Sequence, residues 1–116
     1  MAKIDLVKRP YLHSPRHLLR YVFFTEMQVE QAAKILNALM DNDNKVPDSE
    51  WEDKFLLSSR GLYVKVMRKL RDVGLVEKEL GNYKLSKTFA DALSKIATKW
   101  YELLEGYQEG DRDIRF

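Results

Sequence analysis

SSRGLYVKVMRKLRDVG, residues 58–74, is the stretch that decides the fold of this chain. Its leading serines are typical helix caps and Gly74 is a typical helix stop, so a helix is expected to run to about Val73. On a helical wheel its apolar residues cover an arc of about 140°, which is enough to dock on a core. The opposite side holds one acid, Asp72, and five cations: Arg60, Lys65, Arg68, Lys69 and Arg71.

The residues around this helix predict a hairpin after it and a short helix before it. Residues 75–80 and 83–86 flank Gly81-Asn82, a pair typical of a two-residue turn between strands. Upstream, Asp48 can cap a short helix that carries Trp51, Phe55 and Leu56. Residues 45–47 are expected to be extended, with Pro47 excluded from a central strand.

The two ends of the chain predict three more helices. Ser14-Pro15 starts a short helix over about 15–24, and Thr25 with Gln28 forms a capping box for a helix over about 26–41. A long helix is expected from about Lys87 to Tyr107, ending near Gly106. Residues 1–13 are expected to be irregular.

Two helices joined by a tight turn, with a hairpin directly after the second, are typical of a winged helix-turn-helix. The expected fold is mainly α with a small β-hairpin and a long C-terminal dimerisation helix. A chain of 116 residues has room for one such domain, residues 1–116. We divide it into a basic N-terminal arm and short helix (1–24), a winged-helix core (26–86), a C-terminal helix (87–107) and a flexible tail (108–116).

Composition excludes several classes of protein. The chain has no cysteine, no apolar run long enough for a membrane span and no secretory signal, so we expect a cytoplasmic protein that makes no membrane contact. It has no phosphate-binding glycine loop and no catalytic set, and His13 and His17 are separated by Pro15, so we expect no enzyme activity, no cofactor and no metal site. Whether a small-molecule effector exists stays open.

The formal net charge of +2 hides a strong segregation of charge. Residues 58–73 carry five cations and one acid, and residues 1–20 carry five cations and one acid as well: Lys3, Lys8, Arg9, Arg16 and Arg20 against Asp5. The intervening residues 41–54 carry six acids and two cations. Two basic blocks of this kind can attract a nucleic acid although the whole chain is almost neutral.

The serine-led helix, the Val73-Gly74-Leu75-Val76-Glu77 step and the Tyr83-Lys84-Leu85-Ser86 step resemble the winged-helix repressors of the PadR and MarR type. The resemblance covers roughly residues 29–104. It implies a transcriptional regulator that binds double-stranded DNA through residues 58–73, with Ser58, Ser59, Arg60, Val64, Lys65 and Arg68 facing the DNA.

From the charge pattern we expect Lys69 and Arg71 to contact phosphates as well. The short hairpin tip, together with Glu77 and Glu79 beside it, predicts a minor role for the wing, with contacts from Lys78, Asn82 and Lys84. Two other hypotheses stay open: a winged-helix module that binds another protein, and a DNA-binding architectural or replication-associated factor without sequence preference.

The C-terminal helix carries an apolar seam with spacings of 4, 3, 4, 3 and 4 residues, which is typical of a helix that pairs with another. The seam predicts a homodimer interface made by Phe89, Leu93, Ile96, Trp100, Leu103 and Tyr107. The alternative is that residues 15–24 of the same chain cover this seam.

Overall fold

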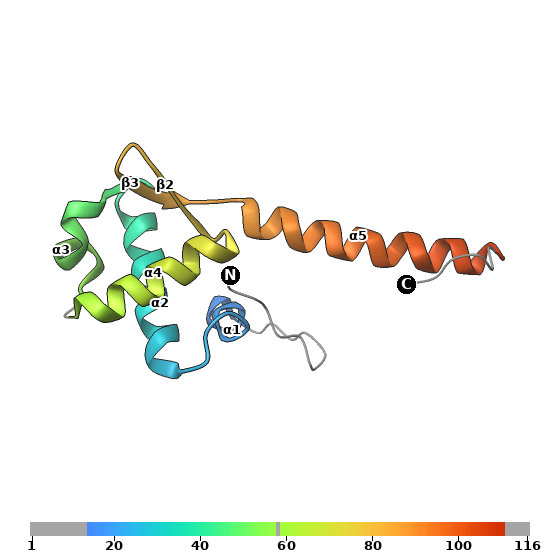
Figure 1. The fold of residues 1–116 in the computed structure, drawn as a ribbon, viewed down its shortest axis with the longest axis horizontal. Helices are drawn as coiled ribbons and strands as arrows, with labels where there is room; N and C mark the ends of the chain where they lie inside the picture. Colours follow the sequence, from blue (N-terminus) through green and yellow to red (C-terminus); the bar gives the residue numbers. More distant parts are fainter. Residues whose placement is uncertain (1–13, 58, 111–116) are drawn as a thin grey trace.

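The computed structural model describes residues 14–57 and 59–110, so the expectations for residues 1–13, Ser58 and residues 111–116 lie outside the described residues. The chain is mainly helical with a small three-stranded antiparallel sheet (Figure 1). Its elements are α1 (Pro15–Arg20), α2 (Glu26–Asp41), β1 (Val46–Pro47), the 3-10 helix η1 (Asp48–Glu50), α3 (Trp51–Phe55), α4 (Arg60–Val73), β2 (Val76–Glu79), β3 (Asn82–Leu85) and α5 (Thr88–Gln108).

The ends of α2 and α4 confirm the caps expected from the sequence. The Thr25 hydroxyl accepts a hydrogen bond from the Gln28 amide at 3.1 Å, and the Ser59 hydroxyl accepts one from the Leu62 amide at 3.2 Å. Gly74 ends α4 with a φ of 88°, a left-handed conformation that glycine adopts without a steric penalty. The first and last turns of α4 are therefore fixed by local chemistry.

The sheet has the order β1-β3-β2, so Pro47 lies on an edge strand as the sequence requires. The hairpin turn lies one residue earlier than expected. Glu79 pairs with Asn82, which leaves Leu80 and Gly81 as the turn, with φ values of 52° and 80°. A two-residue turn with positive φ at both positions accommodates glycine best, and here Gly81 takes the second position while Leu80 is almost fully exposed.

The hydrophobic core lies around α2, which packs against α1, α3, α4 and β3. Among the described residues no charged side chain is buried, and the buried tyrosines Tyr63 and Tyr83 pair their hydroxyls with each other. Burying apolar area of this kind is the main force that holds such small elements together. The residues that are almost completely buried are Val29, Ala32, Ile35, Leu39, Val46, Phe55, Val66, Leu70 and Val76.

The long helix α5 leaves this body and extends away from it (Figure 1), giving the molecule dimensions of 58 × 29 × 25 Å. Its first turn is attached to the end of α4, because the Phe89 amide donates a hydrogen bond to the Gly74 carbonyl at 2.9 Å. The helix continues through Gly106 to Gln108, so Gln108 belongs to α5 and not to the predicted tail. None of the described helices is long and apolar enough to cross a membrane.

Candidate nucleic-acid interface

The outer side of α4 carries four exposed cations, Arg60, Lys65, Arg68 and Arg71. Within residues 14–57 and 59–110, none of these four forms an ion pair with a carboxylate. Helical spacing places them on one half of the helix, together with exposed Val64 and Asp72. We call these four side chains the basic face of α4.

The inner side of α4 is held by aromatic contacts. The Tyr63 ring stacks on Trp51 with ring centroids 4.6 Å apart and an interplanar angle of 6°, and it lies edge-on to Tyr83. The Tyr63 and Tyr83 hydroxyls are hydrogen-bonded at 2.8 Å. Burial and this hydrogen bond raise the pKa of Tyr63, so its hydroxyl stays neutral at physiological pH. These contacts fix the rotation of α4 about its axis, and hence the direction of its basic face.

The N-terminal end of α4 is open and built from small residues. Gly61 is exposed, and a Cβ placed there would have only the Ser59 hydroxyl within 4 Å. That hydroxyl accepts from the Leu62 amide, which leaves its own proton free to be donated. Free amides at a helix N-terminus favour an anion. Ser58, the other predicted contact here, lies outside the described residues.

A groove open to solvent runs between α4 and the β2–β3 hairpin. Its polar lining includes the cations Arg68, Arg71 and Lys78 and the carboxylates of Asp72 and Glu77. The groove floor is apolar and aromatic, with Tyr63, Met67, Val76 and Tyr83. An anionic strand in this groove would meet Arg68 and Arg71 beside Asp72 on the α4 wall, and Lys78 beside Glu77 on the hairpin wall.

The hairpin lysines are paired with carboxylates of their own chain. Lys78 Nζ lies 2.6 Å from Asp48, and Lys84 Nζ lies 2.5 Å from Glu79 and 3.3 Å from Glu77. Hydrogen bonding to Lys78 lowers the pKa of the Asp48 carboxyl, and hydrogen bonding to Glu79 raises the pKa of Lys84. These pairs were not predicted from the sequence, although Glu77 and Lys84 are directly opposite each other in the hairpin register.

The third predicted hairpin contact, Asn82, is half-buried, and its side-chain amide donates to the Leu80 carbonyl at 3.4 Å. Its side chain therefore supports the turn. Together with the paired lysines, this leaves the hairpin with little unpaired positive charge to offer a phosphate.

Lys69 differs from the other cations of α4. It is half-buried, and its ammonium lies 4.6 Å from the centroid of the Phe24 ring and 5.7 Å from that of Phe23. Helical spacing places it half a turn away from Arg60. A cation over an aromatic ring is attracted by the ring quadrupole. We therefore leave Lys69 out of the basic face, and its predicted phosphate contact stays a prediction.

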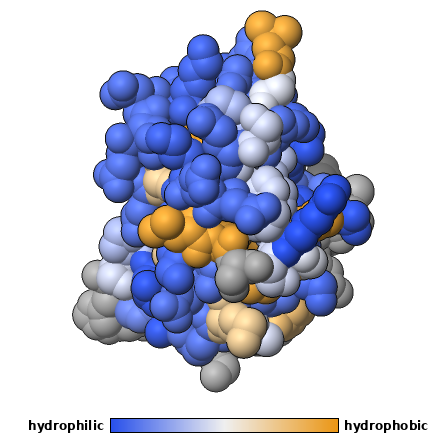
Figure 2. Space-filling model, turned by 90° about the vertical axis from the view of Figure 1, so that its left-hand side faces the viewer, coloured by the Kyte–Doolittle hydropathy of each residue, from blue (hydrophilic) through white to orange (hydrophobic). Residues whose placement is uncertain are grey.

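The end of the molecule opposite α5 is mainly hydrophilic. Figure 2 shows this end, where α3, the hairpin and the start of α4 gather, and the hydrophobic areas visible there are separated by polar surface. Such a surface is more typical of contact with a charged partner than of a permanent apolar interface.

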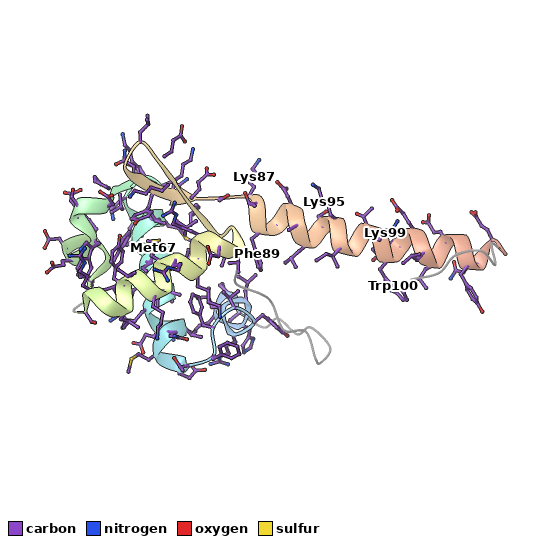
Figure 3. All side chains as sticks on the ribbon, in the orientation of Figure 1. Met67, Lys87, Phe89, Lys95, Lys99 and Trp100 are labelled. Atoms are coloured by element: carbon purple, nitrogen blue, oxygen red, sulfur yellow. The ribbon has the colours of Figure 1, made fainter. Side chains whose placement is uncertain are left out.

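The predicted dimer seam on α5 divides into two parts. Phe89 is buried in the core of its own chain and so has little surface to offer a partner, and Leu93 packs half-buried against the same core. Phe89 is buried because the hydrogen bond from its amide to the Gly74 carbonyl holds the first turn of α5 against the body. Farther along, Ile96 is 65% and Trp100 51% exposed, Tyr107 is exposed and Leu103 is half-buried. In Figure 3, Phe89 and Trp100 lie on the same side of α5, and Lys87 and Lys95 point away from that side.

Residues 15–24, the alternative cover, belong to the body of the chain. Leu19, Val22 and Phe23 are buried in the core, and α1 packs against α2. On the far half of α5, Ile96, Trp100 and Tyr107 each keep half or more of their surface exposed.

No group of three or more histidine, cysteine or acidic side chains in the described part of the chain is arranged to hold a metal ion, and His13 lies outside that part. A protein-family model with the description "Archaeal family" matches residues 9–105, which includes every described element up to the last turn of α5. Neither a curated protein nor a solved structure matches the chain.

Proposed function

The chain belongs to this archaeal family, and we propose that it is a winged helix-turn-helix protein that binds double-stranded DNA as a homodimer and regulates transcription in the cytoplasm. The observation that carries the proposal is the basic face of α4, whose four cations are exposed and make no ion pair within the described residues. We assign α4 to the major groove, α3 to the preceding helix of the motif, and the β2–β3 hairpin to the wing.

The contrast between α4 and its surroundings supports this assignment. Lys78 and Lys84 of the hairpin are neutralised by carboxylates, and Arg20 pairs with Glu26 at 3.1 Å. Cations that lack such partners gain most from an external polyanion, because each phosphate contact releases counterions. The stacking of Tyr63 on Trp51 and its hydrogen bond to Tyr83 hold α4 in one orientation, as a helix that contacts base edges requires.

Position along α4 divides the proposed roles. Arg60, Val64 and Lys65, with the Ser59 hydroxyl, lie toward the N-terminal end and would reach base edges, since recognition helices usually present that end to the bases. Arg68 and Arg71 line the groove beside the hairpin and would hold a phosphate backbone there. Affinity would therefore come mainly from Arg68 and Arg71, and sequence preference mainly from the residues at the N-terminal end of α4.

A salt titration tests the proposal. Fluorescence anisotropy with a random-sequence duplex should give binding that weakens steeply with salt, and Arg68→Ala/Arg71→Ala should reduce the magnitude of the slope of log K against log salt by about 2. The matched control, Lys34→Ala/Lys87→Ala, removes the same charge from exposed positions on α2 and just before α5, and it should leave the slope nearly unchanged. Equal losses in both variants would contradict a DNA surface on α4.

Selection of preferred DNA sites, followed by the same binding measurement, separates the other hypotheses. Selection from a random pool should yield preferred sites, and Arg60→Ala should weaken binding to them by about 1–3 kcal/mol while it changes random-DNA binding less. Equal loss on both DNAs, or affinity without preferred sites, favours an architectural factor. No binding even at low salt overturns the proposal and favours a module that binds another protein.

A further inference from the structure

The far half of α5 presents an apolar stripe with two different flanks. The stripe consists of Ile96, Trp100, Leu103 and Tyr107, which recur every three or four residues and so share one side of the helix. One flank is apolar and carries Ala97 and Leu104. The other flank is charged and carries Lys95, Lys99 and Glu102. Within the chain, the Lys99 ammonium is 3.9 Å from Glu102, a long ion pair on the surface.

These flanks distinguish the two ways in which two α5 helices can pair through the stripe. In a parallel pair, each flank faces the opposite flank of the other helix, so Lys95 and Lys99 would face Ala97 and Leu104. In an antiparallel pair, like flanks face each other. The apolar flanks would then extend the stripe, and Lys99 of one copy would approach Glu102 of the other.

The distribution of charge along the helix favours the same orientation. Residues 87–99 carry Lys87, Lys95 and Lys99 with one acid, whereas residues 100–110 carry only acids, Glu102, Glu105 and Glu109. An antiparallel pair brings the basic half of each helix beside the acidic half of the other, and it also opposes the two helix dipoles favourably. A parallel pair would place like charges side by side along the whole contact.

From these observations we propose that a second copy of this chain covers the far half of α5, with the two α5 helices antiparallel and crossing between Trp100 and Leu103. Knobs-into-holes packing then sets the register. Trp100 of each copy lies beside Leu103 of the other, and Ile96 lies beside Tyr107. The inference rests on the homodimer of the proposed function but not on DNA binding. Because Phe89 is buried in its own chain, the contact begins near Ile96 and the two bodies lie at opposite ends of the pair.

Cysteine cross-linking tests the orientation directly, because the chain has no cysteine of its own. Two single variants, Ile96→Cys and Tyr107→Cys, are refolded separately and as a mixture and then oxidised in the absence of DNA. The antiparallel pair predicts a covalent dimer only in the mixture, where 96 meets 107. Light scattering on the unmodified protein gives the oligomeric state, and thermal unfolding establishes that both variants fold.

Each result has a definite meaning. A covalent dimer in the mixture alone supports the proposal. Self-cross-linking of each single variant indicates a parallel pair and overturns it. A dimer by light scattering without any cross-link would place the interface elsewhere. A monomer at every concentration would mean that no dimer forms. Either outcome overturns the proposal. Because these readouts contain no DNA, a failure here leaves the salt titration of α4 unaffected.

A matched pair of substitutions checks the surface itself. Leu103→Asp puts a carboxylate into the stripe and should raise the dissociation constant of the dimer by at least tenfold, about 1.4 kcal/mol. Thr98→Asp adds the same charge on the opposite side of α5 and should change it little. Similar effects from both would contradict the assignment of the stripe as the contact.

Discussion

The helices α4 and α5 have the same kind of sequence pattern but different surroundings. Each is an amphipathic helix, and in α4 the apolar side is covered by α2 and the hairpin, so that Val66 and Leu70 are fully buried. In α5 the first turn is covered, because Phe89 is buried in the core, whereas Ile96 farther along remains 65% exposed. The comparison shows that periodicity predicts which side of a helix seeks cover, whereas the rest of the chain decides whether cover is present.

The largest expected effect tests this difference with one truncation in each helix. Leu70→Ala should lower the free energy of unfolding by about 2–5 kcal/mol, because it opens a cavity in the core. Ile96→Ala should lower the free energy of unfolding by less than about 0.5 kcal/mol in dilute protein, where no second copy is bound to α5. Urea unfolding at low protein concentration measures both. A large loss for Ile96→Ala under those conditions would mean that the chain itself covers this side of α5.

A smaller effect is expected at the joint between the two helices. Gly74 has a φ of 88°, and a Cβ there would lie 2.7 Å from the Thr88 Cβ and 2.8 Å from the Phe89 nitrogen. Gly74→Ala should therefore cost about 2–3 kcal/mol of stability, from backbone strain together with a clash. Gly81→Ala is the control, since Gly81 also has positive φ but has nothing within 4 Å, and it should cost about 1 kcal/mol. Equal losses by thermal unfolding would show that backbone strain alone acts at Gly74.

The smallest effect concerns pH. Lys78 lowers the pKa of Asp48 in the folded chain, so the ion pair contributes stability above the unfolded pKa of about 4, and this contribution disappears as pH falls through the lower folded value. Asp48→Asn should therefore flatten the decline of stability as pH falls below about 4. Glu102→Gln on α5, measured in dilute protein where no second copy is bound, removes only the long intramolecular pair with Lys99 and serves as the control. Identical profiles for Asp48→Asn and the unmodified protein would remove the Asp48 pair as a contributor.

Local chemistry made much of the fold predictable from the sequence. The caps at Thr25 and Ser59 and the stop at Gly74 depend on neighbouring residues only, and all three are found in the structure. The hairpin was predicted one residue out of place, because Gly81-Asn82 and Leu80-Gly81 both offer a residue that tolerates positive φ. Cross-strand pairing of Glu79 with Asn82 selects the second, and that pairing depends on the whole sheet.

The candidate site was predictable to a smaller extent. The sequence identifies the cations of α4, but it does not show that Lys69 lies over Phe24, because residues 24 and 69 are brought together only by packing of the α1–α2 connection against α4. The pairing of Lys78 with Asp48 likewise joins segments that are 30 residues apart. Long-range contacts of this kind decide which charges remain free for a partner, and charge counts along the chain do not contain them.

The joint at Gly74 makes α5 a lever. Its 21 residues extend about 31 Å from the point where the Phe89 amide meets the Gly74 carbonyl. A tilt of about 5° at that joint would move the far end of α5 by about 3 Å, close to the rise of one base pair. A residue without a side chain at the end of α4 thus sets the distance at which a second basic face would be held, and a small change in its backbone angles would be amplified into a different spacing along a duplex.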